Sequence, residues 1–487
     1  MMSSHYKVLK SMCKEYNESF LSLYKLNTFN SEEIDKICND ITKNLIQTKY
    51  FSPIQILSKI TKICIYNNRF SKTYWRIFKQ IFDKFRPNPN CDMGYIFNYF
   101  VNNDIHFNDE NKEYFEINET SNKKIPDENW INSIIINDAK KQFIQLIESS
   151  DFDIDQNIKC KFYPSGEGHS LLELCCYHGS VDCFKFLITK FDPEITLQCL
   201  QFSFLGGNLD IITECLKEQQ PDEICMKYAI ITHNIDFVSF LMNQYGIEID
   251  LKCCAKYNNI DAFLVYLDQT NDINKCFVFS PLFCFTALSE YLLEHCANIG
   301  SKSLDGINYN QFKYFSHSAL DYALKYGNEE ILKLLISKGI NVNENDQHGK
   351  SALHIAVIND RLEFLKILIP HMEDINVKDK NGNTALHDAV ALTNMEFIKV
   401  LISNGADINA LNNDERSPLH ISCLEINYIY TGLQPYAVSN NDYYVIKFLI
   451  EHGAQLNLRD KYENTALHYA TNLSPEIPAL LLSYGAV

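Results

Sequence analysis

Four copies of one tetrapeptide decide the fold of this chain: Ser351–His354 (SALH), Thr384–His387 (TALH), Ser417–His420 (SPLH) and Thr465–His468 (TALH). They begin 33, 33 and 48 residues apart, and a related SALD at Ser318–Asp321 begins 33 residues before the first. A sequence that recurs at a fixed interval of this size predicts a stack of similar structural units. Each unit is too short to fold alone, so its stability must come from its neighbours.

The segment from Asp379 to Leu411 shows how one unit is built. Asp379–Gly382 has the composition of a tight turn, in which glycine supplies a positive φ. Thr384 can cap a first helix, Ala389 is small where two helices approach, and Gly405 can end the second helix. A period of 33 with a T-P-L-H-x-A pattern resembles the ankyrin repeat. The expected fold is all-α: an ankyrin-type helical solenoid with short β-hairpin fingers in the C-terminal half, preceded by a small helical N-terminal domain.

Fainter repeats precede residue 313. The residue five positions after the start of each tetrapeptide is small, and a similar helix-pair pattern recurs upstream. Its small positions are Ser133, Cys175, Ser203, Ala229, Cys254 and Ser280. From Cys175 onward their intervals are 28, 26, 25 and 26 residues, which leaves room for two short helices and little for a hairpin. We therefore expect helical pairs without fingers, and a loop from Gly300 to Phe315.

The N-terminal region predicts helices without this periodicity. One apolar face is expected to consist of Val8, Met12, Tyr16, Phe20 and Leu23. Ser31 is expected to cap a second helix and Pro53 to begin a third. Ser71 begins a fourth helix, whose aromatic face includes Trp75 and Phe78. That face could be a groove for a partner, but one-sided apolar stripes normally pack inward, so we expect core.

Three further stretches extend the resemblance over nearly the whole chain: residues 66–72 (YNNRFSK), 171–179 (LLELCCYHG) and 201–208 (QFSFLGGN). The chain is similar to a large family of trichomonad-type protist ankyrin proteins. These have a helical N-terminal region, a middle domain of unknown function and C-terminal ankyrin repeats. The resemblance implies a fold and brings no assigned activity. The expected parts are a helical N-terminal domain at 1–101, a linker at 102–127, degenerate ankyrin-like helical repeats at 128–300 and ankyrin repeats at 313–487.

Composition narrows the classes of partner. The chain has a net charge of −17 and a pI of about 5.3. An acidic surface repels phosphate, so no nucleic acid is expected, and a partner with a basic surface is favoured. The first ten residues are too polar for a signal peptide, and the most apolar run, residues 276–288, is too short to span a bilayer. We expect no membrane insertion and a cytoplasmic location, with the nucleus left open.

Histidines and cysteines raise the question of a metal site. The four tetrapeptide histidines lie in different repeats and have no second ligand at metal-binding spacing. We expect them to hydrogen-bond the backbone and to bridge adjacent turns. A second cluster has a spacing that helix packing explains and that matches no usual pattern of metal ligands. Its members are His169, Cys175, Cys176, His178 and Cys183. Without a secretory signal the 17 cysteines are expected to be reduced, and no metal or cofactor is predicted.

The sequence favours binding over catalysis. It contains no GxxxxGK[ST], HExxH or GxSxG motif. The leading hypothesis is a non-catalytic scaffold for protein–protein interaction. Two alternatives stay open: a substrate adaptor that joins a larger assembly through its N-terminal helices, and an enzyme with an unrecognised site in the middle block. A bound metal or nucleotide in that block would favour the enzyme.

The partner is expected on the concave surface that turn tips and first helices form. The tip positions are Gln347, His348, Lys350, Lys380, Asn381, Asn383, Asn413, Asp414, Arg416, Lys461, Tyr462 and Asn464. Glu415 and Glu463 stand where the other turns have glycine. Because positive φ is costly for a residue with a Cβ, we expect these two turns to take another shape.

Two departures from the repeat pattern are further candidates. The fourth strong repeat is 48 residues long instead of 33, and its insertion at about 427–440 contains Tyr428, Tyr430 and Tyr436. Tyrosine is frequent in binding hot spots, so the insertion either contacts a partner or packs on the solenoid itself. The segment Leu480–Val487 is apolar where solenoids usually have a polar cap, which predicts an exposed apolar end that either self-associates or docks elsewhere.

Overall fold

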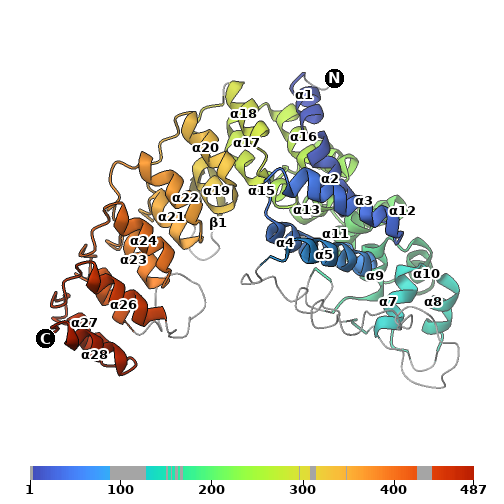
Figure 1. Ribbon diagram of the computed structural model, residues 1–487. Coiled ribbons are helices and arrows are strands. Elements are labelled where there is room, and N and C mark those ends of the chain that lie inside the picture. The colour runs from blue at the N-terminus through green and yellow to red at the C-terminus, as the bar shows by residue number, and fades with distance from the viewer. Residues whose placement is uncertain are drawn as a thin grey trace. The chain divides into compact units, whose positions relative to one another are not determined.

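The computed structural model describes residues 4–87, 128–149, 152–154, 156–158, 163–164, 168–295, 297–307, 314–346, 348–424 and 441–487. The chain divides into two compact units, Met1–Asp272 (unit 1) and Ile273–Val487 (unit 2). Helices dominate both units, which confirms the all-α class (Figure 1). The N-terminal helices therefore share a unit with the middle helices. The expected linker at 102–127 lies outside the described residues.

Unit 1 begins with helices that do not repeat. They are α1 (Ser4–Met12), α2 (Lys14–Tyr24), α3 (Ser31–Ile41), a π-helical turn (Thr42–Ile46), α4 (Pro53–Cys64), a 3-10 turn (Asn68–Phe70) and α5 (Ser71–Phe85). Ser52 caps α4 in a reciprocal capping box with Gln55, which leaves Pro53 at the first helical position as predicted. The cap of α3 is Asn30, whose Oδ1 accepts the Glu32 N–H at 2.8 Å, so the prediction of Ser31 was wrong by one residue.

The apolar face of the first helices also differs from the expectation. Val8 is 52% exposed, and Leu9 and Cys13 are buried in its place. The buried residues Leu9, Cys13, Tyr16 and Phe20 follow steps of four and three, which keep to one side of a helix with 3.6 residues per turn. Two residues four positions apart differ by about 40° in direction around the helix axis. The predicted stripe advances mostly in steps of four, so its first member, Val8, points away from the core. Trp75 and Phe78 of α5 are buried, as expected for a core face.

The middle of unit 1 is a series of helical pairs. They are α7 (Glu128–Ile136) with α8 (Lys140–Ile147), α9 (Leu171–His178) with α10 (Val181–Phe191), α11 (Leu197–Gly206) with α12 (Leu209–Glu218), α13 (Glu223–Ile231) with α14 (Ile235–Tyr245), and α15 (Leu251–Lys256) with α16 (Ile260–Thr270). The first helices from α9 onward have the N-caps Ser170, Thr196, Asp222 and Asp250, so the pairs recur every 26 to 28 residues. No strand interrupts residues 171–270, all of which are described.

Unit 2 continues with longer units. Its elements are α17 (Ile273–Phe279), a 3-10 turn (Ser280–Phe283), α18 (Thr286–Glu294), β1 (Lys302–Ile307), β2 (Tyr314–Ser318), α19 (Ala319–Tyr326), α20 (Glu329–Ser337), α21 (Ala352–Ile358), α22 (Leu362–Leu368), a 3-10 turn (Ile369–His371), α23 (Ala385–Ala391), α24 (Met395–Ser403), α25 (Pro418–Cys423), α26 (Asn441–Glu451), α27 (Ala466–Ala470) and α28 (Glu476–Ser483). β1 and β2 pair antiparallel, with Lys302 opposite Ser318. The prediction of a loop from Gly300 to Phe315 was therefore wrong for the residues of this segment that lie in β1 and β2.

The small positions predicted from the sequence lie in the core. Buried positions of this series in unit 1 are Cys175, Ser203, Ala229 and Cys254, and in unit 2 they are Ser280, Ala323, Ala356, Ala389, Ser422 and Ala470. Ser133 is only half-buried. Close packing leaves little volume where the two helices of a pair approach, so only small side chains fit there.

The last pair, α27 and α28, leaves several apolar side chains uncovered. Leu482, Tyr484 and Val487 are exposed. Leu467 is half-buried, whereas its counterparts Leu353, Leu386 and Leu419 in the preceding pairs are fully buried. Self-association through this end remains a prediction. Within the described ranges, no helix is both long and apolar enough to cross a bilayer.

Candidate functional site

Before four first helices of unit 2, the chain makes a five-residue turn, which we call a finger. The fingers are Asp346–Lys350, Asp379–Asn383, Asn412–Arg416 and Asp460–Asn464. In each one the backbone N–H of the first residue donates to the carbonyl of the fifth, at 2.8 to 3.0 Å. A side-chain oxygen of the first residue also accepts the N–H groups of the third and fifth residues. Aspartate or asparagine at the first position therefore fixes the shape of the finger.

The fourth finger position has positive φ in all four fingers. Gly349 and Gly382 have φ of 74° and 76°, and Glu415 and Glu463 have φ of 57° and 64°. The expectation that the two glutamates would force another turn shape was therefore wrong. The hydrogen bonds of the finger hold the backbone in the left-handed region although a side chain with a Cβ disfavours it by about 1 kcal/mol or more.

Glu415→Gly is expected to stabilise unit 2 by about 1 kcal/mol, because it removes the left-handed strain and the exposed carboxylate makes no described contact that offsets it. Urea unfolding followed by circular dichroism measures the change. Glu396→Gly is a matched control, because Glu396 is an exposed glutamate in the first turn of α24. There glycine is expected to cost about 1 kcal/mol. A loss of stability in both variants would contradict the strain at Glu415.

Neighbouring fingers are joined at their tips. The N–H of Lys380 donates to the carbonyl of His348 at 3.1 Å, that of Asn413 to Asn381 at 3.0 Å, and that of Lys461 to Asp414 at 3.0 Å. At the approach of the second and third fingers a Cβ on Gly382 would lie 2.5 Å from the backbone nitrogen of Asn413, so glycine fits that position. The tips therefore form one row with fixed spacing.

The tetrapeptide histidines hold each first helix to the next finger. The Nδ1 atoms of His354, His387 and His420 accept the backbone N–H of Ser351, Thr384 and Ser417 at 3.1 to 3.2 Å. Because Nδ1 accepts, Nε2 carries the proton, and it donates to the carbonyls of Asn383, Arg416 and Asn464 at 2.9 to 3.2 Å. This confirms the predicted bridging of adjacent turns.

Burial keeps these imidazoles neutral. It lowers the pKa of His387 to about 4, and it lowers the pKa values of His354 and His420 in the same direction. His468 accepts the N–H of Thr465 in the same way but is exposed. Its Nε2 has no following finger carbonyl among the described residues.

Two basic side chains bind acidic groups of the next repeat. Lys350 Nζ lies 3.2 Å from Asp379 Oδ2 and 3.1 Å from Asp388 Oδ2. Burial alone lowers the pKa of Lys350, but the two carboxylates outweigh it and the pKa is raised. Burial raises the pKa of Asp388, and Lys350 opposes that shift. Lys350 therefore links its own finger to the next repeat through Asp379 and Asp388.

Arg416 makes the corresponding link one repeat later. Its Nε lies 3.2 Å from Asp460 Oδ2, its Nη2 donates to the Tyr469 hydroxyl at 3.1 Å, and its guanidinium lies 5.5 Å from the ring centroid of Tyr462. Sequence reasoning missed Asp388 and Tyr469. Each stands four residues after its N-cap, Thr384 or Thr465, so a polar residue at that position of the first helix was the available signal.

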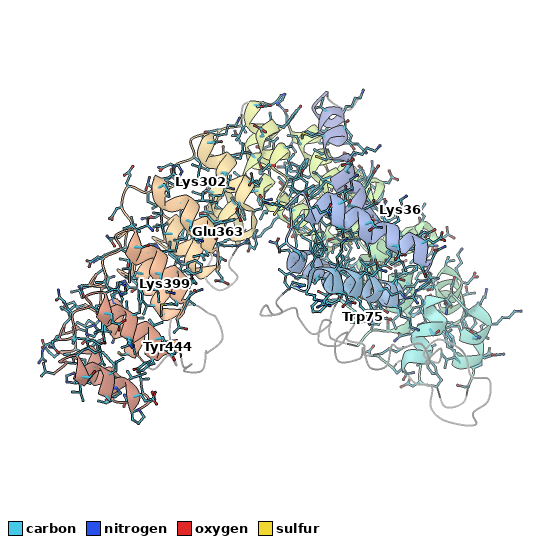
Figure 2. All side chains as sticks on the ribbon, viewed as in Figure 1. Lys36, Trp75, Lys302, Glu363, Lys399 and Tyr444 are labelled. Carbon is cyan, nitrogen blue, oxygen red and sulfur yellow. The ribbon has the colours of Figure 1, made fainter. Side chains whose placement is uncertain are left out.

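The structure separates the predicted tip residues into two groups. The side chains of one group are exposed: His348, Lys380, Asn381, Asn413, Lys461 and Tyr462. Two of these also contact the preceding finger, because Asn413 Nδ2 donates to the Lys380 carbonyl at 2.8 Å and Lys461 Nζ pairs with Asp414. The other group is partly buried and takes part in the finger contacts: Lys350, Asn383, Asp414, Arg416 and Asn464. Gln347, Tyr428, Tyr430 and Tyr436 lie outside the described residues. At the start of α26, Tyr444 is exposed (Figure 2) and Tyr443 is half-buried.

The histidines of the middle block have packing partners. His178 Nε2 lies 3.0 Å from the Tyr163 hydroxyl, and His169 Nδ1 lies 3.6 Å from Glu173 Oε2. Cys175, Cys176 and Cys183 are buried thiols. In the described ranges, no three histidine, cysteine or acidic side chains are grouped so that they could hold a metal ion.

Comparison with known families identifies the repeats. A family model described as ankyrin repeats (3 copies) matches residues 285–379, 325–412, 353–431 and 425–487. The C-terminal half of this chain carries ankyrin repeats. A second model, a domain of unknown function (DUF3447), matches residues 191–266, within the helical pairs of unit 1. No curated protein matches the chain. The fingers described above are thus the hairpin turns of the ankyrin repeats.

Proposed function

We propose that the ankyrin repeats of this chain form a non-catalytic surface that binds another protein. The observation that carries the proposal is the row of fingers, whose tips are hydrogen-bonded to one another while six of the predicted tip side chains remain exposed. Ankyrin repeats suggest a role in protein–protein interaction. Because the spacing of the row is fixed before binding, little conformational entropy is lost when a partner binds to it.

The chemistry of the row favours a partner with an aromatic-binding pocket and basic groups. Tyr462 is 58% exposed, and the cations of Lys461 and Arg416 lie 5.1 and 5.5 Å from its ring centroid. Tyrosine in such a position is a common binding anchor. Exposed Glu415 and Glu463 and the net charge of −17 favour basic groups around that anchor.

Affinity purification with the intact chain and quantitative mass spectrometry tests the proposal. The double variant Lys461→Ala/Tyr462→Ala is expected to recover at least about tenfold less of the partner, because it removes a hot-spot anchor. The matched control is Glu396→Ala/Lys399→Ala, which removes an exposed ion pair of α24. Figure 2 labels Lys399. Equal recovery with the tip variant contradicts the proposal, and a loss with the control places the surface on the second helices instead.

A further inference from the structure

A row of aromatic rings runs along the first helices of unit 1. Tyr177, Phe202 and Tyr228 lie on α9, α11 and α13, and Tyr257 follows α15 directly. Each stands six or seven residues after the N-cap of its helix. The ring centroids of Tyr177 and Phe202 are 5.5 Å apart, and those of Phe202 and Tyr228 are 6.1 Å apart. We call these four side chains the aromatic row; all of them are buried.

The N-terminal helices cover the aromatic row. Directly after α4, the carbonyl of Ile65 accepts the Tyr177 hydroxyl at 2.6 Å. The ring of the next residue, Tyr66, lies 6.3 Å from that of Tyr228 and 5.7 Å from that of Tyr257, and the hydroxyls of Tyr66 and Tyr257 are 3.1 Å apart. One short turn of the chain thus contacts three members of the row.

Polar contacts flank this aromatic contact. Asn258 Nδ2 donates to the Tyr16 hydroxyl at 2.8 Å, and Lys59 Nζ donates to Asn258 Oδ1 at 2.7 Å. Asn17 Nδ2 donates to Asp261 Oδ2 at 2.8 Å, while the second oxygen of this buried carboxylate lies 3.7 Å from Lys10 Nζ. The N-terminal helices therefore present the aromatic groups of Tyr16 and Tyr66, together with donors from basic and amide groups, to the middle pairs.

This contact has the properties of a docking interface. The N-terminal helices also pack among themselves: the ring centroids of Phe20 and Phe51 are 5.6 Å apart, and the buried Tyr74 hydroxyl donates to the Leu23 carbonyl at 2.7 Å. Among the described residues, no hydrogen-bond partner is found for Asn17 Oδ1 or His233 Nδ1, which lie at or beside the contact, and Asp261 Oδ1 has only the 3.7 Å ion pair with Lys10. Buried polar atoms without a partner reduce the stability of the docked state. Interfaces between domains of one chain are on average more polar than permanent, core-like interfaces, and this contact has that character.

We propose that α1 to α5 are an internal ligand of the middle helical pairs and that the aromatic row beneath them is a second binding face. When these helices leave, the face takes an amphipathic helical segment of a partner, with an aromatic side chain in the place of Tyr66 and a basic side chain opposite Asp261. The net charge of −17 favours such a basic segment. The proposal does not depend on the finger surface of the ankyrin repeats.

Cleavage of the intact chain tests whether the N-terminal helices are ligand or core. A protease site with glycine–serine flanks is inserted between residues 110 and 111, and the cleaved protein is passed over a size-exclusion column. The two fragments of the otherwise unchanged protein are expected to co-elute. Asn17→Asp places a second carboxylate against Asp261 and is expected to weaken the association at least about tenfold. Asn39→Asp, on an exposed position of α3, is the matched control and keeps co-elution.

The fragment that remains after cleavage shows whether α1 to α5 are a releasable ligand or part of the core. After release of the N-terminal fragment it is expected to keep its helical circular dichroism and to bind a labelled synthetic peptide of residues 53–70, and the Tyr66→Ala peptide is expected to bind at least about tenfold more weakly. Loss of helicity on release would show that α1 to α5 are core and would overturn the proposal. Co-elution of the Asn17→Asp fragments up to the urea concentration that unfolds unit 1 would overturn it as well.

Discussion

Gly206→Ala is expected to destabilise unit 1 by about 4 kcal/mol, although alanine is the better helix former by about 1 kcal/mol. Gly206 is the last residue of α11, and a Cβ there would lie 2.1 Å from the carbonyl oxygen of Cys176 and 2.6 Å from the nitrogen of Gly179. Both are backbone atoms at the end of α9, so no side-chain rotation relieves the overlap. The two helices would have to separate, and their packing would be lost.

The neighbouring glycine is the control for this prediction. Gly207 has a φ of +70°, and a Cβ built on it meets nothing within 4 Å. Gly207→Ala is therefore expected to cost about 1 kcal/mol for the left-handed backbone alone. Urea unfolding of both variants, followed by circular dichroism, measures the difference. Equal losses would show that α9 and α11 are not held at this close distance in solution.

Acidification from pH 7.5 to 5.5 is expected to destabilise unit 1 by about 3 kcal/mol. Burial lowers the pKa values of His178 and His233 to about 3, whereas the pKa of an unfolded histidine is about 6.5. Between those values the unfolded chain binds more protons than the folded chain, so stability falls as the pH falls. At pH 5.5 each histidine contributes about 1.4 kcal/mol of this loss.

A substitution separates this histidine effect from other acid effects. In His233→Gln, which removes the titrating group but keeps a donor for the Tyr257 carbonyl, the loss between the two pH values is expected to be smaller by about 1.4 kcal/mol. His452→Gln is the control, because His452 is an exposed histidine after α26 in unit 2. Urea unfolding at both pH values measures the loss. An unchanged loss in His233→Gln would refute the assignment.

The helical pairs were predictable because their signals are local. The tetrapeptide contains the N-cap and the histidine three residues later, and the small residue follows two positions after that histidine. In unit 1 the position three after the N-cap holds Cys199, Cys225 and Cys253. These pairs have no following finger carbonyl to bind, so a small buried thiol replaces the imidazole. The pair of α9 and α10 has Glu173 at this position, so the thiol marks the three pairs that follow it.

The candidate surface was predictable only in part. Glycine and asparagine nearby in the sequence indicated which residues stand at finger tips. They did not indicate which of these side chains bind a neighbouring repeat and are therefore not available to a partner. Lys350 and Arg416 resemble free cations in the sequence, yet each binds a carboxylate 29 or 44 residues further along the chain. Glu415 resembled a disrupted turn, yet four hydrogen-bonded fingers share one shape. These outcomes depend on the neighbouring repeat, which a local pattern does not contain.

The sequence by itself determined the helical pairs, their spacing and the small residues between their helices, because capping and periodicity act over a few positions along the chain. The tertiary structure decided that the N-terminal helices cover the aromatic row. That contact joins Tyr66 to Tyr257 and Asn17 to Asp261, pairs 191 and 244 residues apart. Such distant groups meet only after the pairs have stacked, so complementarity of the assembled surfaces, and no repeating pattern, specifies their contact.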